Sequence, residues 1–281
     1  MTRHFKPFVL NAIANVHLAF FQKELPDTLA VYFHEVEAWQ MQKLDEALSF
    51  FAREGYRTVR PGDLASPARQ GDKRLFLSFD DNFRGWHGIL DLLERHDASC
   101  TFYLNTGPIR DAADASSIAR YFARIRYKGG DTTLSRAEIR DLHAAGHVIG
   151  CHTHTHPMLS KLPREQWDAE ILRCKTEVEE LVGAPAPDFS FPFGMRRHFS
   201  PELRDYCARI GFRTIATGIS GLQHAARIDP LNIHRTRWCF ERSLEDNLAR
   251  LRVHSPLYAG VTGRCAVGSS NWLAAPLPLV W

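Results

Sequence analysis

Short apolar runs alternate with helical patterns along most of this chain, and this alternation limits the folds that the chain can adopt. Candidate strands occur at 29–33, 75–79, 100–104, 147–151, 188–191, 212–216 and 233–239. Candidate helices occur at 38–54, 86–96, 115–126, 135–145, 164–182, 200–210 and 242–252. Because strands that alternate with helices form parallel sheets covered by helices, we predict an α/β fold. About seven parallel strands indicate a distorted (β/α) barrel, similar to a TIM barrel.

Several predicted helices carry recognisable ends. Ser135 stands before RAEI as an N-cap, and Pro201 occupies the first turn of a helix. Gly55 and Gly146 stand where helices should close, since glycine adopts the left-handed backbone at a helix end without strain.

We predict one α/β domain over 28–254, preceded by an N-terminal extension at 1–27 and followed by a C-terminal apolar tail at 255–281. Within the extension, 8–22 has the pattern of an amphipathic helix that either packs on the domain or lies on a membrane surface. The long 105–133 segment is expected to pass over the rim of the sheet and to shape a cleft.

Composition excludes several classes of protein. A formal net charge of +3 with scattered basic residues does not fit a nucleic-acid-binding surface. Six cysteines without a CxxC pair fit buried thiols in a reducing compartment. No apolar run approaches the roughly twenty residues that a transmembrane helix needs. We therefore expect a cytoplasmic protein, with peripheral contact at the inner membrane face left open.

Two polar clusters follow strand ends. Asp80 and Asp81 come after 75–79, and HTHTH at 152–156 comes after 147–151. Because carboxyl ends of parallel strands share one rim, these side chains should meet there. Two imidazoles and one carboxylate would give a divalent metal three ligands and leave positions open for water and substrate. The second carboxylate would then serve as a base, whereas His154 should point away from its neighbours.

These segments resemble the polysaccharide deacetylase family, the NodB-homology domain of carbohydrate esterase family 4, across about residues 28–252. FDDN at 79–82 is similar to the first motif of the family, and HTHTHP at 152–157 is similar to the second. The resemblance implies that Asp80 is the general base. It also implies that Asp81, His152 and His156 bind a divalent metal, commonly zinc.

FPFG at 191–194 resembles the third motif, which lines the cleft and offers a backbone amide to the developing oxyanion. By this resemblance Phe193 supplies the amide, with Pro192 beside it in the cleft. The arginine of the motif, which orients the base, is missing because Ser190 stands in its place. Arg235 or Arg237 could replace it from another strand.

A histidine of the last family motif protonates the leaving amine. LNIH at 231–234 fits this motif, so His234 is the first candidate, with His254 second and His198 third. His34 in VYFHEV matches a Y-H-x-V segment found in one branch of the family. Its imidazole either faces the substrate cleft or is satisfied by neighbouring backbone.

Three tryptophans either stack on sugar rings or pack in the interior, namely Trp86, Trp167 and Trp238. The function expected from the resemblance is removal of an N-acyl group, in the first instance acetyl, from an amino sugar or glycan precursor. Two alternatives stay open. The same site could act on a formamide, a cyclic imide or an O-acetyl ester, or the chain could be a catalytically silent relative that binds a glycan or a partner.

Overall fold

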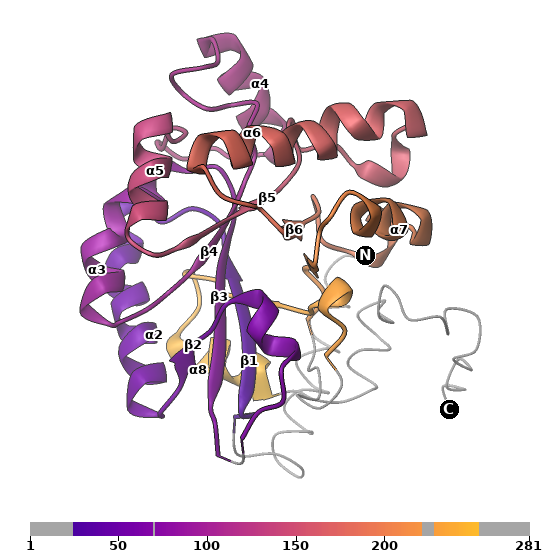
Figure 1. Ribbon diagram of the computed structural model, residues 1–281. Coiled ribbons are helices and arrows are strands. Elements are labelled where there is room, and N and C mark those ends of the chain that lie inside the picture. The colour runs from indigo at the N-terminus through magenta and orange to yellow at the C-terminus, as the bar shows by residue number, and fades with distance from the viewer. Residues whose placement is uncertain (1–24, 70, 221–227, 253–281) are drawn as a thin grey trace, which may run out of the picture.

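A computed structural model describes residues 25–69, 71–220 and 228–252. These residues form one curled, fully parallel sheet with helices on its outer face (Figure 1). The strands are β1 (Thr28–Phe33), β2 (Arg57–Thr58), β3 (Arg74–Asp81), β4 (Thr101–Leu104), β5 (Val148–Cys151), β6 (Asp188–Ser190), β7 (Thr214–Ala216) and β8 (Thr236–Arg237). Their order is β7-β6-β5-β4-β3-β1-β8, and β2 pairs with the start of β3. The predicted barrel-like α/β fold is confirmed.

One short segment contacts both edges of the curled sheet. Ile233 forms a parallel bridge with Ala216 of β7, whereas Thr236 and Arg237 pair with β1. The Ile233 amide donates to the Ile215 carbonyl at 2.8 Å, and the Trp238 amide donates to the Tyr32 carbonyl at 3.0 Å. The segment 233–237 therefore closes the curl, and the side chains on its inner side lie inside the barrel.

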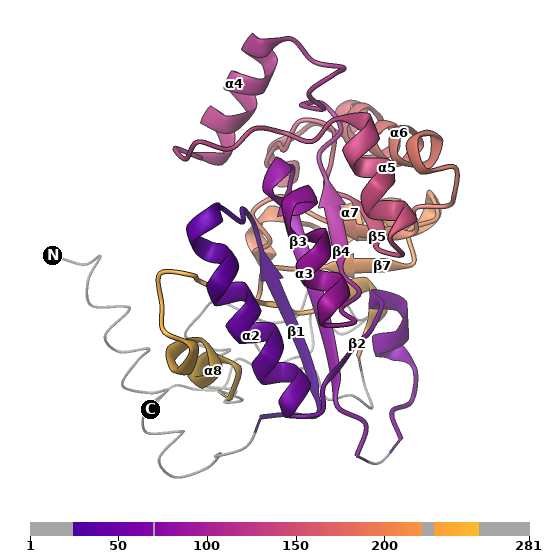
Figure 2. The ribbon, with the colours of Figure 1, turned by 90° about the vertical axis from the view of Figure 1, so that its left-hand side faces the viewer.

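Each helix expected from the sequence is present. The α-helices are α2 (Met41–Arg53), α3 (Leu90–Arg95), α4 (Ala115–Ile125), α5 (Arg136–Ala144), α6 (Arg173–Val182), α7 (Pro201–Arg209) and α8 (Leu244–Arg252). Short turns of helix precede three of them, at Ala38–Gln40, at Arg84–Ile89, and at Arg164–Gln166 with Asp168–Leu172. Figure 2 shows α2 and α3 along the outside of β1 and β3, with α4 beyond the carboxyl-terminal ends of these strands.

The helix ends follow the sequence signals. Ser135 caps α5 and forms a reciprocal capping box with Glu138, and Pro201 occupies the first turn of α7. Gly55 and Gly146 have φ angles of +83° and +90°, which side-chain-bearing residues rarely adopt. Capping groups and glycines therefore fix where these helices begin and end.

The largest differences from the predicted strands concern β2 and β8. The two-residue strand β2 was not predicted, because two residues carry no periodicity. β8 is shorter than the predicted 233–239, since the first residues of that run pair with β7 instead of β1. Both differences come from pairing between distant segments, which a local pattern does not encode.

The sheet is held from outside by an aromatic column. Phe79 of β3 stacks between Phe33 of β1 and Phe102 of β4, with ring centroids 4.9 and 5.0 Å away. Every residue of β3 is buried. This packing fixes the strand that carries Asp80 and Asp81.

Some predictions concern residues that the structure does not describe. His254, the predicted tail at 255–281 and the predicted extension before residue 25 lie outside the described residues. Within the described part of the chain, no helix has the length and apolarity needed to cross a bilayer. The five cysteines there are free, and four of them are buried.

Glu138 links three segments near the carboxyl ends of the strands. Its carboxylate accepts hydrogen bonds from Arg84 at 2.8 Å, Arg110 at 2.9 Å and the Ser135 amide at 2.8 Å. Burial raises the pKa of this carboxyl, but the arginines and Ser135 outweigh burial and lower it to about 2.

Glu138→Gln should lower the free energy of unfolding at pH 7 by about 1–2 kcal/mol, because two arginines lose their anionic partner. The pKa of Glu138 is lower in the folded protein than in the unfolded chain, where it is about 4.3. The Glu138 carboxylate therefore contributes its full stabilisation above pH 4.3, and this stabilisation is lost as the pH falls toward 2. Urea denaturation of both proteins at pH 7 and pH 3 should show a narrower difference at pH 3. An equal difference at both pH values would contradict this linkage, and exposed Glu165→Gln is the matched control.

Candidate metal centre

Asp80 and Asp81, the last two residues of β3, line the same cleft although side chains alternate between the two faces of a strand. A change of backbone direction at Asp81 makes this possible. Ser78 and Asp80 lie on the inner face of the sheet, opposite Phe79. Simple alternation would send Asp81 to the outer face. Its φ of +89° turns the chain instead, and both carboxylates line the cleft. A positive φ at a non-glycine residue costs about 1–3 kcal/mol, so the surrounding contacts must hold it.

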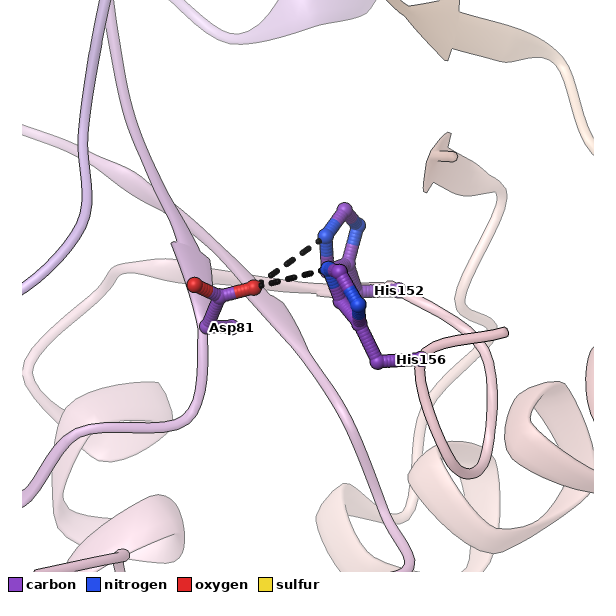
Figure 3. A group of neighbouring side chains, drawn as sticks. All are labelled: Asp81, His152 and His156. Carbon is purple, nitrogen blue, oxygen red and sulfur yellow. Dashed lines mark ion pairs between the residues drawn. The ribbon is translucent and has the colours of Figure 1, made fainter. Parts of the chain in front are cut away.

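Asp81, His152 and His156 form a buried cluster with ligand atoms facing one another (Figure 3). The Oδ1 atom of Asp81 lies 3.5 Å from Nε2 of His152 and 3.2 Å from Nε2 of His156. Ligands of a tetrahedral zinc ion, bound at about 2.0–2.2 Å, lie roughly 3.3–3.5 Å apart. Among the described residues, this is the cluster of histidine, cysteine and acidic side chains that could hold a metal.

Hydrogen bonding prepares His152 for this role. Its Nδ1 lies 2.7 Å from the Ser190 carbonyl, so this nitrogen donates its proton and leaves the lone pair on Nε2. Burial raises the pKa of Asp81, but hydrogen bonds with His152 and His156 bring it well below the usual value. The Oδ1 atom of Asp81 is buried, and its neighbours within 3.5 Å are the Nε2 atoms of these two imidazoles. An ionised carboxylate oxygen and a free imidazole nitrogen together suit a divalent cation.

Asp80 faces Arg235. The guanidinium donates from Nη1 to Oδ1 and from Nη2 to Oδ2 of Asp80, both at 2.7 Å. Arg235 is fully buried, and its other hydrogen bonds go to the hydroxyls of Ser78 and Ser190 and to the Thr217 carbonyl. Burial raises the pKa of Asp80, but the adjacent guanidinium outweighs it and holds the pKa below the usual value.

The two candidate arginines of the segment 233–237 occupy different places. Arg235 reaches Asp80 inside the barrel, whereas Arg237 is exposed and lines the cleft. Ser190, which stands at the position of the expected arginine, donates its hydroxyl to Asp80 at 3.2 Å. The structure therefore brings an arginine to Asp80 from the irregular part of the segment 233–237, just before β8.

A pair of asparagines that the sequence analysis did not identify supports the histidine loop. Asn105 follows β4, and its side-chain amide donates to the carbonyls of His152 and Thr153. The Oδ1 atom of Asn105 accepts a hydrogen bond from the Tyr121 hydroxyl at 3.0 Å. The side-chain amide of Asn82 donates to the backbone carbonyl of Asn105, also at 3.0 Å. Both asparagines are fully buried. Each directly follows a strand on the same rim as the aspartates, and this position in the sequence could have identified them as residues of the site.

The same loop has strained backbone. Thr153 and His156 have φ angles of +71° and +60°. The Thr153 hydroxyl accepts from the His156 amide at 3.1 Å, and Thr155 bonds Glu170 through its amide and hydroxyl. These hydrogen bonds hold the strained backbone of the segment that presents the two imidazoles.

A cleft of about 510 Å³ opens above the cluster. It is lined by Asp80, Asp81, His152 and His156 together with His34, Phe193 and Arg237. Burial lowers the pKa of His34, and the negative charge of Asp81 opposes this shift. The predicted cleft residues His34 and Phe193 therefore lie with the cluster, whereas Pro192 is buried and does not line the cleft.

His234 lies elsewhere. It is not among the residues that line the cleft, because its neighbour Arg235 occupies the inner side of the same segment. Its Nε2 is buried without a hydrogen-bond partner among the described residues, and burial lowers its pKa to about 4. His198 lies beside Phe193, with ring centroids 5.3 Å apart, and it does not line the cleft.

The remaining aromatic and histidine candidates pack away from the cleft. Three tryptophans are at most 7% exposed, namely Trp86, Trp167 and Trp238. They pack in the interior, so the alternative in which they stack on a sugar ring is wrong. His154 bonds the Thr106 hydroxyl at 2.9 Å and Glu177 at 3.0 Å, on the side away from the cluster. These side chains therefore have structural partners.

Comparison with known proteins agrees with these features. Residues 68–215 match the family model described as polysaccharide deacetylase. Over 134 residues, 47% of this chain, the sequence is 28% identical to a chitooligosaccharide deacetylase of Rhizobium leguminosarum bv. trifolii. Over 151 residues, 53% of this chain, it is 25% identical to a peptidoglycan-N-acetylglucosamine deacetylase of Listeria monocytogenes. The matched parts cover 49% and 26% of these two relatives, so the chain spans half of their length or less.

Solved structures show the same fold. A Streptococcus pyogenes deacetylase in complex with acetate superposes with a TM-score of 0.64 at 18% identity, covering 83% of this chain and 99% of that one. IcaB from Ammonifex degensii gives a TM-score of 0.62 at 15% identity, again with 83% and 99% coverage. At these identities the likeness concerns the fold.

Asn105→Ala should weaken binding of zinc roughly 10- to 100-fold, because the histidine loop loses the amide that holds its carbonyls. Competition with a chromophoric chelator measures this affinity. Asn247→Ala is the matched control, since Asn247 is also buried and bonds backbone groups, but in α8. Equal zinc affinity in the two variants would show that Asn105 does not support the cluster.

Proposed function

The chain belongs to the polysaccharide deacetylase family, and from this we propose that it is a metal-dependent hydrolase that removes an N-acyl group, in the first instance acetyl, from an amino sugar or glycan precursor. One observation carries the proposal. A buried carboxylate and two imidazoles lie within ligand distance of one another, and a second carboxylate beside them is held by an arginine.

In this proposal Asp81, His152 and His156 hold a divalent cation, and zinc suits the ligand set best. When bound, the ion would acidify a water molecule and polarise the acyl carbonyl. The chain supplies three ligands from two strand ends, which leaves the cleft side of the cluster open to solvent and substrate.

Asp80 is the general base of the proposed reaction. Its pKa lies below the usual value, so the carboxylate is ionised and can accept a proton at neutral pH. The two-pronged contact with Arg235 fixes the plane of the carboxylate, and Asp80 still lines the cleft. We assign Arg235 the orienting role, because it and not Arg237 contacts Asp80 among the described residues.

Phe193 is the proposed source of the oxyanion-binding amide. Phe193 has a φ angle of +65° and Gly194 one of +61°, so the loop turns at the cleft. Gly194 also packs against Gly218, where a Cβ atom would lie too close to the Gly218 backbone. A rigid, close-packed loop can present a backbone N–H to a developing negative charge without reorganising during the reaction.

His34 is the proposed acid for the leaving amine, in place of His234. Of the histidines expected to act as acid or to line the cleft that fall within the described residues, His34 lines it and His198 and His234 do not. It lies close enough to Asp80 and Asp81 for their charges to act on its pKa. A group that protonates the amine must reach the same acyl centre as the base.

The acyl substrate class is tested directly by the products. Released acetate and formate, measured against N-acetylglucosamine oligomers and small acylated sugars, distinguish N-deacetylation from action on formamides or O-acetyl esters. Retention of a buried, ionised Asp80 beside the ligand carboxylate argues against a silent binding relative, since two buried acids raise the electrostatic cost of folding without a benefit to binding.

Asp80→Asn should lower kcat for acetate release about 10²- to 10⁴-fold while zinc stays bound, because the proton acceptor is lost and the three proposed metal ligands are kept. His152→Ala should lose both zinc and activity. Zinc content by atomic emission and acetate release are measured on the same preparations, with exposed Asp141→Asn as the control. Activity that survives both substitutions would end this mechanism.

His34→Ala should lower kcat at least about 100-fold and remove the alkaline limb of the pH profile, since that limb reports the loss of the acid's proton. His234→Ala should stay within a few-fold of the wild type. A full pH–rate profile of each variant makes the comparison. The reverse pattern would return the acid role to His234.

A further inference from the structure

The two imidazoles of the metal cluster are held in different ways. Nδ1 of His152 lies 2.7 Å from the Ser190 carbonyl, and this hydrogen bond fixes the orientation of the ring. Nδ1 of His156 is buried and has no hydrogen-bond partner among the described residues. The His156 ring packs edge-on against Phe193, which is itself 43% exposed. The position of His156 therefore depends mainly on the backbone of the histidine loop at 152–156 that carries it.

Glu170 holds the two residues that precede His156. The main-chain carbonyl of Glu170 accepts a hydrogen bond from the His154 amide at 2.8 Å. Its carboxylate accepts from the Thr155 amide at 2.8 Å and from the Thr155 hydroxyl at 2.7 Å. The next residue, His156, has a φ angle of +60°, which a residue with a side chain adopts only when its surroundings hold it there. Three hydrogen bonds to one residue thus fix the path of the chain into His156.

Glu170 lies in a turn of π-helix, Asp168–Leu172, that leads directly into α6. Such turns are rare inside helices and occur frequently at functional sites. In this turn both the main-chain carbonyl and the carboxylate of Glu170 face the histidine loop. The turn is itself fixed, because Ile171 is fully buried and Asp168 accepts from the Tyr206 hydroxyl at 2.5 Å. The π turn is therefore a firm base from which Glu170 contacts the loop.

We propose that Glu170 is a positioning residue of the metal centre, which holds His156 in place for the metal through Thr155. The inference rests on the proposed function, because it takes the cluster to be a metal site. A carboxylate suits this role, since its two oxygens accept the Thr155 amide and hydroxyl together and an ionised acceptor strengthens both hydrogen bonds. Arg124 of α4 also donates to the Thr155 carbonyl at 2.5 Å, but this arginine is exposed, where water competes for its donors.

Competition with a chromophoric chelator measures the affinity of the full chain for zinc and tests this role. Glu170→Ala should weaken zinc binding about tenfold. Glu170→Gln should stay within about threefold of the wild type, because its amide oxygen still accepts the Thr155 amide and its NH₂ group bonds the Thr155 hydroxyl. Glu179→Ala is the matched control, since Glu179 lies in α6 and accepts the Ala186 amide at 3.1 Å. Equal zinc affinity in Glu170→Ala and Glu179→Ala, or no rescue by glutamine, would overturn the proposal.

A double-mutant cycle separates positioning of His156 from a general effect on the fold. If Glu170 acts through His156, Glu170→Ala should cost about tenfold in the wild type and less than about twofold in the His156→Ala background. An equal cost in both backgrounds would contradict the proposed role. Thr155→Val removes only the hydroxyl contact with Glu170 and replaces Glu170→Ala in the cycle if that variant does not fold. It should weaken zinc binding in the same direction, again only while His156 is present.

Zinc affinity and acetate release, measured on the same preparations, keep this inference apart from the proposed function. A wild type that binds zinc but releases no acetate from any substrate would contradict the proposed reaction. In that case a weaker affinity in Glu170→Ala, restored by Glu170→Gln, still supports the positioning role. A wild type that releases acetate, with a zinc affinity that does not respond to Glu170→Ala, would overturn the positioning role and leave the reaction in place.

Discussion

The ion pair between Asp80 and Arg235 lies in the interior of the curled sheet, where an unpaired charge would cost several kcal/mol. Its members come from β3 and from the segment 233–237, which are far apart in the sequence. The remaining guanidinium donors bond Ser78, Ser190 and Thr217, so the pair also ties together β3, β6 and the residue after β7. Closure of the barrel and the orientation of Asp80 therefore depend on the same contact. Tyr32 and Tyr103 place their rings 4.7 and 5.2 Å from the guanidinium carbon and complete its surroundings.

Two aspartates that are adjacent in the sequence acquire different chemistry because their surroundings differ. Asp80 follows the alternation of β3 onto the inner face and meets a guanidinium. Asp81 is turned by its positive φ and meets two imidazoles. Both pKa values lie below the usual value for aspartate, but for different reasons. In the proposed reaction this separation assigns one carboxylate to the proton and the other to the metal.

Much of this could be predicted from local sequence, because strand and helix periods, helix caps and the order of the polar clusters are local properties. The rim that gathers Asp80, Asp81, His152 and His156 follows from parallel strands alone. The direction in which a side chain points on an irregular segment cannot be predicted from the arrangement of the strands. Arg235 and Arg237 were equivalent in the sequence, and His234 matched a family motif, yet the inner side of 233–237 belongs to Arg235. The hydrogen bonds of Asn105 with the histidine loop span 47 and 48 residues, so no local pattern reveals them.

The proposed reaction requires that Asp81, His152 and His156 bind the metal while Asp80 stays with Arg235. Anomalous diffraction at the zinc absorption edge, from crystals of the zinc-loaded protein, tests it most directly. We expect one strong peak at coordinating distance from Asp81 Oδ1 and the Nε2 atoms of both histidines, with both Asp80–Arg235 hydrogen bonds intact. A peak elsewhere, no peak, or an Asp80 that leaves Arg235 to coordinate the zinc would contradict it.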